Sequence, residues 1–276
     1  MKKLVLIFIW LILLPGISSA SFLKDLWPKW QVNDPLSKEI ISHQEWQQFL
    51  DRCVVTNKEG INLINYPQLT AENRALLNNY ITRMGTIDIK KYNRNEQLAF
   101  WLNLYNALTV QAVAEYYPIT NILEINTSPG LFSIGPWGAS LITIDNTRLS
   151  LDEIHNRIIR PIWNDPRTHY AISNGTIGGA NLHKKAFIGN TIQQQLNEVA
   201  RNYINSTRGA QVIEGKLVVS RIYEWFTADF GGTAEDTLLH LREFANEPLS
   251  SQLKHVSNIS GYTYNWRLNS TLPVIS

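Results

Sequence analysis

The sequence has 276 residues, with 25 Lys and Arg against 23 Asp and Glu. This balance leaves no large excess of basic charge, which argues against a nucleic-acid partner. Cys53 is the only cysteine, so an intramolecular disulfide is excluded. It lies among apolar residues at helical spacing, where we expect a small, half-buried core residue rather than a nucleophile.

Residues 1–20 have the pattern of a signal peptide. Two lysines precede the apolar run LVLIFIWLILL, and small residues close the segment. A membrane anchor is the alternative, but the run is shorter than the roughly 20 residues that a spanning helix needs. We therefore expect a periplasmic or secreted protein that begins near Ser21 and has no stable membrane insertion after cleavage. Residues 21–36 are expected to form an N-terminal extension, and residues 37–276 a single domain.

The first half of the chain is predicted to be helical. Amphipathic spacing predicts helices over residues 37–55 and 70–84. The segment 93–118 is apolar on almost every side, and Pro118 ends it. Because a helix that is apolar all round is usually buried, we expect this one to run through the centre of the fold.

Hairpins and helices alternate in the second half. We predict hairpins over 141–151, turning at Asp145-Asn146, and over 211–220, turning at Glu214-Gly215. The remaining elements are a helix over 151–160 with a capping box at Ser150, a strand over 168–173, a glycine turn over 174–181, a helix over 191–205, two further helices and a final strand over 261–270. The pattern predicts an α+β fold: a mainly helical single domain with a central buried helix and a small antiparallel sheet built from hairpins.

Polar side chains in apolar surroundings supply the first candidate site residues. Asn103 and Asn106 are three residues apart and share one face of the predicted central helix. Buried amides need hydrogen-bond partners. Either they tie the helix to a neighbouring loop, or they reach into a cleft as ligand or oxyanion donors. His169 opens the stretch HYAISNGTIGGANL, whose glycines form either a plain turn with positive φ or a cradle for phosphate.

The usual signatures of metal and nucleotide sites are missing from the sequence. None of the 6 histidines has the spacing of a zinc-ligand pair, and no G-x-S-x-G motif, P-loop or dinucleotide fingerprint occurs. We therefore expect no metal and no cofactor. Most tryptophans lie in apolar runs, so packing is favoured over a sugar-stacking surface.

Several segments, taken together and in order, resemble domain-of-unknown-function family 547. They are GINLINYPQL, NEQLAFWLNLYNALTV, LSLDEIHNRIIR, DPRTHYAIS, SRIYEWFTADF and YTYNWRLN. The resemblance covers about residues 35 to 270 and implies a bacterial or plant family, often exported in bacteria. The residues that match the family pattern in type are Trp101, Asn103, Tyr105, Asn106, Arg160, Asp165, Arg167 and His169.

The departures from the family pattern bear on catalysis. The family usually has Cys at the place of Asn174, a Cys-Pro pair at Gly179-Ala180, and Glu-His at His155-Asn156. If family members use a thiolate with a His partner, this chain lacks both. Either the family's cysteines are structural and activity lies elsewhere, or this member has lost catalysis. We favour the second, a pseudoenzyme in which a cleft has kept its shape and lost its thiol chemistry.

Two classes of function remain open. One is an exported, non-catalytic or catalytically degenerate protein that binds a small ligand or a protein partner. The other is a non-thiol hydrolase or transferase that uses the cleft around His169. The candidate cleft comprises Asn103, Asn106, Arg160, His169 and Asn174. A fully buried, hydrogen-bonded His169 would favour the first class, and an accessible His169 with a perturbed pKa the second.

Overall fold

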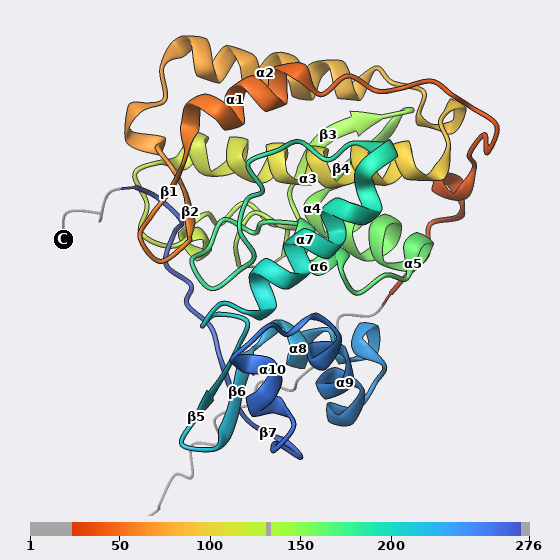
Figure 1. The fold of residues 1–276 in the computed structure, drawn as a ribbon. Helices are drawn as coiled ribbons and strands as arrows, with labels where there is room; N and C mark the ends of the chain where they lie inside the picture. Colours follow the sequence, from red (N-terminus) through yellow and green to blue (C-terminus); the bar gives the residue numbers. More distant parts are fainter. Residues whose placement is uncertain (1–23, 131–133, 272–276) are drawn as a thin grey trace, which may run out of the picture.

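The computed structural model describes residues 24–130 and 134–271, so the predicted signal peptide lies outside the described residues. The chain has the predicted α+β fold, in which helices predominate (Figure 1). Helices α1 (Gln44–Cys53) and α2 (Ala71–Gly85) pack together above α3 (Arg94–Tyr116).

Helix α3 forms the buried centre of the fold, as predicted. Asn93 caps it by accepting hydrogen bonds from the backbone N–H groups of Asn95 and Glu96. Almost every residue from there to Ala114 is buried. Because α3 has no polar face, each polar side chain on it must find a partner within the protein.

Helix α1 is shorter at both ends than the predicted 37–55. The residues before it run along the start of α3, where the buried carboxylate of Glu96 accepts a hydrogen bond from the backbone of Ile41. The residues after it form β1 (Val54–Thr56), which pairs antiparallel with β2 (Asn62–Ile64). Tertiary hydrogen bonds and strand pairing therefore override the local helical pattern.

Both predicted hairpins are confirmed. The first consists of β3 (Ser140–Ile144) and β4 (Thr147–Ser150), and the second of β5 (Ala210–Ile213) and β6 (Lys216–Ser220). In each hairpin the two turn residues have positive φ, as a two-residue turn of this type requires. The last strand, β7 (Ile259–Thr263), starts earlier than predicted and pairs parallel with β6.

The helix after β4 contains an irregular middle. It begins with the predicted capping box of Ser150 and Glu153. It then runs from α4 (Leu151–Glu153) through a π-helical stretch (Ile154–Ile159) into α5 (Arg160–Trp163). Such stretches frequently occur at functional sites, so its surroundings are a natural place to look for one.

The predicted strand over 168–173 is wrong. Residues Thr168–Ala171 form the short helix α6. Asp165 starts it, because its carboxylate accepts from the backbone N–H of Arg167 and its carbonyl accepts from the hydroxyl of Thr168. Every residue of α6 is buried. A short stretch that is buried on all sides has neither the alternation of a strand nor the period of an amphipathic helix.

After β7 the chain runs back to Ile64 of β2, but the segment 210–263 lies at the end of the molecule opposite α1 and α2 (Figure 1). It contains α8 (Ile222–Trp225), α9 (Ala234–Phe244) and α10 (Leu249–Leu253), together with the sheet of β5, β6 and β7. Helix α7 (Ile192–Ile204) packs against α6 above this part. Short 3-10 helices connect the elements at Pro28–Gln31, Tyr66–Gln68, Ile89–Lys91, Ile122–Glu124, Gly189–Thr191 and Thr227–Phe230.

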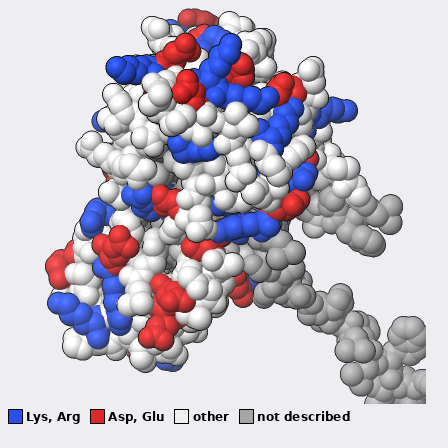
Figure 2. All heavy atoms as spheres, turned by 90° about the vertical axis from the view of Figure 1, so that its right-hand side faces the viewer, with Lys and Arg blue, Asp and Glu red and all other residues white. Residues whose placement is uncertain are grey.

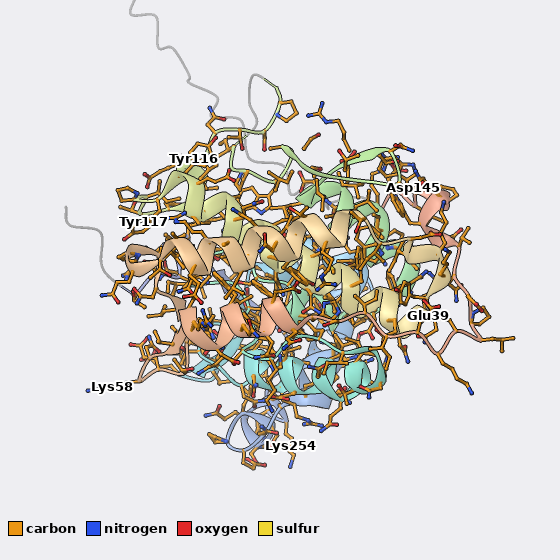
Figure 3. The ribbon with its side chains drawn as sticks, turned by 90° about the horizontal axis from the view of Figure 1, so that it is seen from above. Glu39, Lys58, Tyr116, Tyr117, Asp145 and Lys254 are labelled. Atoms are coloured by element: carbon orange, nitrogen blue, oxygen red, sulfur yellow. The ribbon has the colours of Figure 1, made fainter. Side chains whose placement is uncertain are left out.

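Charged side chains are dispersed over the surface. On the face shown in Figure 2, basic and acidic residues are interspersed. Seen from above, the labelled Glu39, Asp145 and Lys254 lie at the periphery (Figure 3). Within the described residues, none of the helices combines the length and the apolar composition that crossing a membrane requires.

Candidate functional site

The two asparagines of α3 bind neighbouring backbone groups. The side chain of Asn103 donates to the carbonyl of Phe187 and accepts from its N–H, both at 2.9 Å. The side chain of Asn106 donates to the carbonyl of Ala171 at 2.9 Å and accepts from the N–H of Ser173 at 2.7 Å. Both amides are buried. They tie α3 to the end of α6 and to the loop before α7, which is the structural one of the two roles considered for them.

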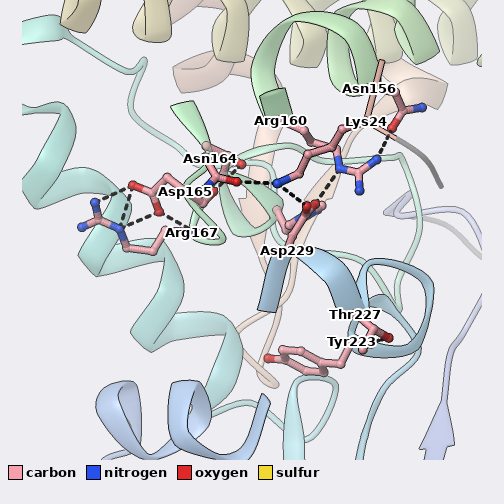
Figure 4. Close-up of polar contacts among 11 residues, drawn as sticks. Lys24, Asn156, Arg160, Asn164, Asp165, Arg167, Tyr223, Thr227 and Asp229 are labelled. Carbon is pink, nitrogen blue, oxygen red and sulfur yellow. Dashed lines mark hydrogen bonds and ion pairs between the residues drawn. The ribbon is translucent and has the colours of Figure 1, made fainter. Parts of the chain in front are cut away.

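His169 lies in a buried charged cluster that is centred on Asp229. The Oδ2 atom of Asp229 accepts from Arg160 Nε at 2.6 Å and from His169 Nε2 at 2.7 Å. Its Oδ1 atom lies 2.8 Å from Lys24 Nζ. Figure 4 shows Arg160 and Lys24 converging on Asp229 from two sides. The side chains of Arg160 and Asp229 are only 1% and 5% exposed. We call Lys24, Arg160, His169 and Asp229 the Asp229 cluster.

Burial and charge act in opposite directions on the pKa values of this cluster. Burial alone would raise the pKa of Asp229, but hydrogen bonds from His169 and Arg160 outweigh it and hold the pKa well below its ordinary value. Burial lowers the pKa of His169 by more than its bond to Asp229 raises it. His169 is therefore neutral near pH 7 and donates its Nε2–H to an ionised carboxylate.

The His169–Asp229 pair resembles the His–Asp pair of a catalytic triad, in which the carboxylate orients the imidazole. A triad also needs a nucleophile bonded to the other ring nitrogen. Within residues 24–130 and 134–271, His169 makes its side-chain hydrogen bond to Asp229 and otherwise packs against rings, including that of Phe230 at 5.4 Å. The geometry fixes His169 in place, and no hydroxyl or thiol of the described residues is hydrogen-bonded to its other ring nitrogen.

The π-helical stretch and the start of α5 each place a buried polar atom near Asp229 that makes no hydrogen bond within the described residues. His155 Nε2 and Arg160 Nη2 are buried and make no hydrogen bond to the described protein. The ring of His155 lies edge-on to that of His169, with centroids 5.1 Å apart. Burial lowers the pKa of His155 well below its ordinary value, so it is also neutral. Buried polar atoms without hydrogen bonds cost free energy, so His155 Nε2 and Arg160 Nη2 are the least well compensated atoms around Asp229.

The N-terminal segment covers the π-helical stretch. The backbone N–H groups of Asp25 and Trp27 donate to the carbonyls of Asn156 and Arg157, at 3.2 and 3.0 Å. Arg157 returns the contact through an ion pair with Asp25 at 3.0 Å and by lying over the ring of Trp27 at 4.2 Å. Lys24 of the same segment pairs with Asp229, so residues 24–27 cover the Asp229 cluster.

Asn174 belongs to a separate polar group. Its amide donates to the hydroxyl of Tyr264 at 2.5 Å and its oxygen accepts from Thr176 Oγ1 at 2.8 Å. Thr176 Oγ1 also accepts from the N–H of Gly179 at 3.1 Å. A Cβ placed on Gly179 would lie 2.4 Å from Asn174 Oδ1. The two positions where the resemblance expects cysteines are therefore in direct contact, and Asn174 shares no hydrogen-bond partner with His169.

Of the five candidate residues, the structure brings Arg160 and His169 together on Asp229. Asn103, Asn106 and Asn174 each bind other groups, as described above. Two small hollows in the described surface are lined by none of the five. Among the residues that the structure describes, no group of three His, Cys, Asp or Glu side chains is arranged to hold a metal ion.

The comparison with known families concerns the middle of the chain. Residues 89–204 match the family described as "Protein of unknown function, DUF547". This match confirms, over that stretch, the resemblance inferred from the sequence. The DUF547 stretch contains α3 to α7 and all five candidate residues, whereas Asp229 and Tyr264 lie beyond it. Searches of curated proteins and of solved structures found no match.

Sequence reasoning missed the residues that organise both groups. Asp229 lies in the apolar run IYEWFTADF. A carboxylate in such a run needs a cationic partner if it is buried, and that signal could have selected it. Tyr264 and Lys24 carry no comparable local signal, because their partners lie far away in the sequence.

Proposed function

We propose that this chain is an exported, catalytically degenerate protein that acts by binding. The contact between Asn174 and Gly179 carries the proposal. At the two positions where the resemblance expects thiols, an amide and a glycine are closed in by Tyr264 and Thr176, and every polar group of this set has a partner. Thiol catalysis needs a thiolate with a base in reach, and an amide cannot replace it.

The environment of His169 supports the same proposal. A general base must come within hydrogen-bond reach of the proton that it removes. His169 is 5% exposed, its Nε2 is bound to Asp229, and the N-terminal segment covers the cluster. These contacts are those of a structural clamp, which joins α5, α6 and the N-terminal segment to Asp229.

A non-thiol hydrolase or transferase is the second candidate. The 2.7 Å contact between His169 and Asp229 favours it, because a carboxylate that orients an imidazole is a frequent part of hydrolytic sites. Such an activity would require the segment around Lys24 to move away from Asp229, since substrate has to reach the imidazole.

Hydrolysis assays separate the two candidates. The purified mature protein would be incubated with p-nitrophenyl acetate and with a peptide p-nitroanilide, in parallel with the variants His169→Asn and His255→Asn. His255 is an exposed control histidine. We expect the three proteins to give the same slow background rate. Turnover that disappears in His169→Asn and persists in His255→Asn would contradict the proposal and establish the second candidate.

A further inference from the structure

Aromatic side chains from three separate segments meet in a half-buried group. Trp225 comes from α8, Tyr264 and Trp266 follow β7, and Trp137 precedes β3. The ring centroids of Trp225, Tyr264 and Trp266 lie 4.8 to 5.4 Å from one another. That of Trp137 lies 6.4 Å from Trp266. We call these four residues the aromatic platform.

The glycine turn of the HYAISNGTIGGANL stretch holds this platform in place. The backbone N–H groups of Ile177 and Gly178 donate to the carbonyls of Arg267 at 2.7 Å and Asn265 at 2.8 Å. A Cβ on Gly178 would lie 2.4 Å from the backbone nitrogen of Asn265, so this approach requires glycine. The hydroxyl of Tyr264 is fixed by Asn174. The rings are therefore positioned before any ligand arrives, which lowers the cost of binding.

The spacing of the rings in the aromatic platform favours a sugar ligand over a proline-rich peptide. Proline-rich peptides dock into grooves between aromatic rings. Rings whose centroids are 4.8 to 5.4 Å apart touch one another and leave no such groove. Their outer faces suit a flat sugar ring instead, because the axial C–H groups of a pyranose can pack on an aromatic face.

The polar atoms of the platform fit the same ligand. Neither ring is fully buried, and the indole N–H groups of Trp225 and Trp266 make no hydrogen bond within the part of the chain that the structure describes. An indole N–H is a donor only, so a sugar hydroxyl is a suitable acceptor. Arg221 and Glu224, the charged residues of the same short segment, pair with each other at 2.7 Å. The two charges of this segment therefore compensate each other.

We propose that the aromatic platform binds a neutral pyranose oligosaccharide, with sugar rings stacked on Trp225 and Trp266. This inference rests on the proposed binding function and names the ligand class for it. The glycine turn thus serves to position a binding surface.

Binding is tested with the full mature protein and three probes: cellohexaose, chitohexaose and maltohexaose. Each is titrated to about 1 mM, a range that detects weak binding, and followed by tryptophan fluorescence and calorimetry. Trp266→Ala is the test variant, because Trp266 lies outside the buried core. Tyr116→Ala is the matched control: Tyr116 is a 47% exposed aromatic at the end of α3, at the periphery in Figure 3.

At least one hexasaccharide should bind, and Trp266→Ala should weaken it by about tenfold or more, as truncation of a tryptophan anchor typically does. Tyr116→Ala should change the affinity by less than about twofold. A more conservative variant, Trp225→Phe, should also weaken binding and guards against misfolding of Trp266→Ala. The inference is overturned if no hexasaccharide binds, or if both tryptophan variants bind as the parent does.

Mass spectrometry of the sugars after incubation keeps this inference separate from the proposed function. Cleavage of a bound hexasaccharide would contradict the proposal that the protein is non-catalytic, but it would still support sugar binding at the aromatic platform. Absence of binding would refute sugar binding at the aromatic platform. It would not affect the proposal that the protein is non-catalytic, because the hydrolysis assays with His169→Asn test catalysis independently.

Discussion

Replacing both Asn174 and Gly179 by cysteine should produce a disulfide. A Cβ on Gly179 would lie 2.4 Å from Asn174 Oδ1, which is two bonds beyond the Cβ of Asn174. The two Cβ atoms are thus near the separation of roughly 3.5–4.5 Å that a disulfide needs. The bridge would close a loop of about six residues and, in the chain-entropy account, stabilise the protein by roughly 2 kcal/mol.

The comparison is made between the oxidised and reduced forms of the same Asn174→Cys, Gly179→Cys variant. Both forms lose the hydrogen bonds of Asn174 to Tyr264 and Thr176, at about 1 kcal/mol each, so this loss cancels. A difference of about 2 kcal/mol corresponds to a melting temperature about 4–8 °C higher for the oxidised form. Thiol titration of the unfolded, oxidised variant should detect only Cys53.

Single substitutions provide the control. Gly179→Ala alone should destabilise the protein by about 1–3 kcal/mol, because its Cβ would overlap Asn174 Oδ1. Adding Asn174→Ala should recover part of that loss. If the double-cysteine variant keeps free thiols under air and oxidised glutathione, or if Gly179→Ala is as stable as the parent, the contact between the two positions is refuted.

The same geometry bears on a relict catalytic site. Asn174→Cys combined with Asn156→His would restore the residue types that the resemblance expects. Asn156 binds Arg160 at 2.8 Å and Asn174 binds Tyr264 at 2.5 Å, so no common partner joins the two. We expect the new thiol to be alkylated no faster than free cysteine. Rapid alkylation would show that a thiolate site survives in this fold.

Four smaller predictions follow from other contacts. Lys24→Met keeps the apolar stem and removes one cation from Asp229, so the unfolding free energy in denaturant should fall by about 1 kcal/mol, and an unchanged value would disprove the ion pair. Burial lowers the pKa of His43 from 6.5 to about 4, so the unfolded chain binds a proton first and His43 should contribute about 2 kcal/mol to the fall in stability between pH 7 and 5. Burial also lowers the pKa values of His155, His169 and His240, so His43→Gln should reduce this slope without removing it. Cys53 is buried with its pKa raised to about 11, so its thiol should resist alkylation until unfolding, and Cys53→Ala should cost about 1 kcal/mol in calorimetry without affecting binding. Intact-mass measurement of exported protein should find a chain that begins near Ser21, whereas a full-length chain held in the membrane would contradict export.

The large elements could be predicted from the sequence because their signals are local. Helix α3 is apolar on all sides and carries its own cap at Asn93, and both hairpins have turn residues that accept positive φ. The error over 168–173 has the opposite cause. Helix α6 is started by Asp165 and buried throughout, so burial removed the periodicity that distinguishes a helix from a strand.

The polar groups were only partly predictable. That Asn103 and Asn106 need partners followed from the cost of burying an amide, but the sequence left open which groups would satisfy them. The partner of His169 lies 60 residues further along the chain, and no local pattern joins it to Asp229. Tyr264 lies 90 residues from Asn174. Such pairings arise only when the fold brings distant segments together.

The Asp229 cluster explains why a histidine with a carboxylate partner need not be catalytic. A buried carboxylate is tolerated only when its charge is compensated, and here Arg160, His169 and Lys24 supply hydrogen bonds or charge from three different segments. Removing Asp229 would leave the guanidinium of Arg160 buried without its counter-ion, a loss of several kcal/mol in comparable cases. The carboxylate therefore holds segments together at a place where water is excluded. Binding needs the opposite environment, and for this reason we place the proposed ligand on the half-buried rings of Trp225 and Trp266.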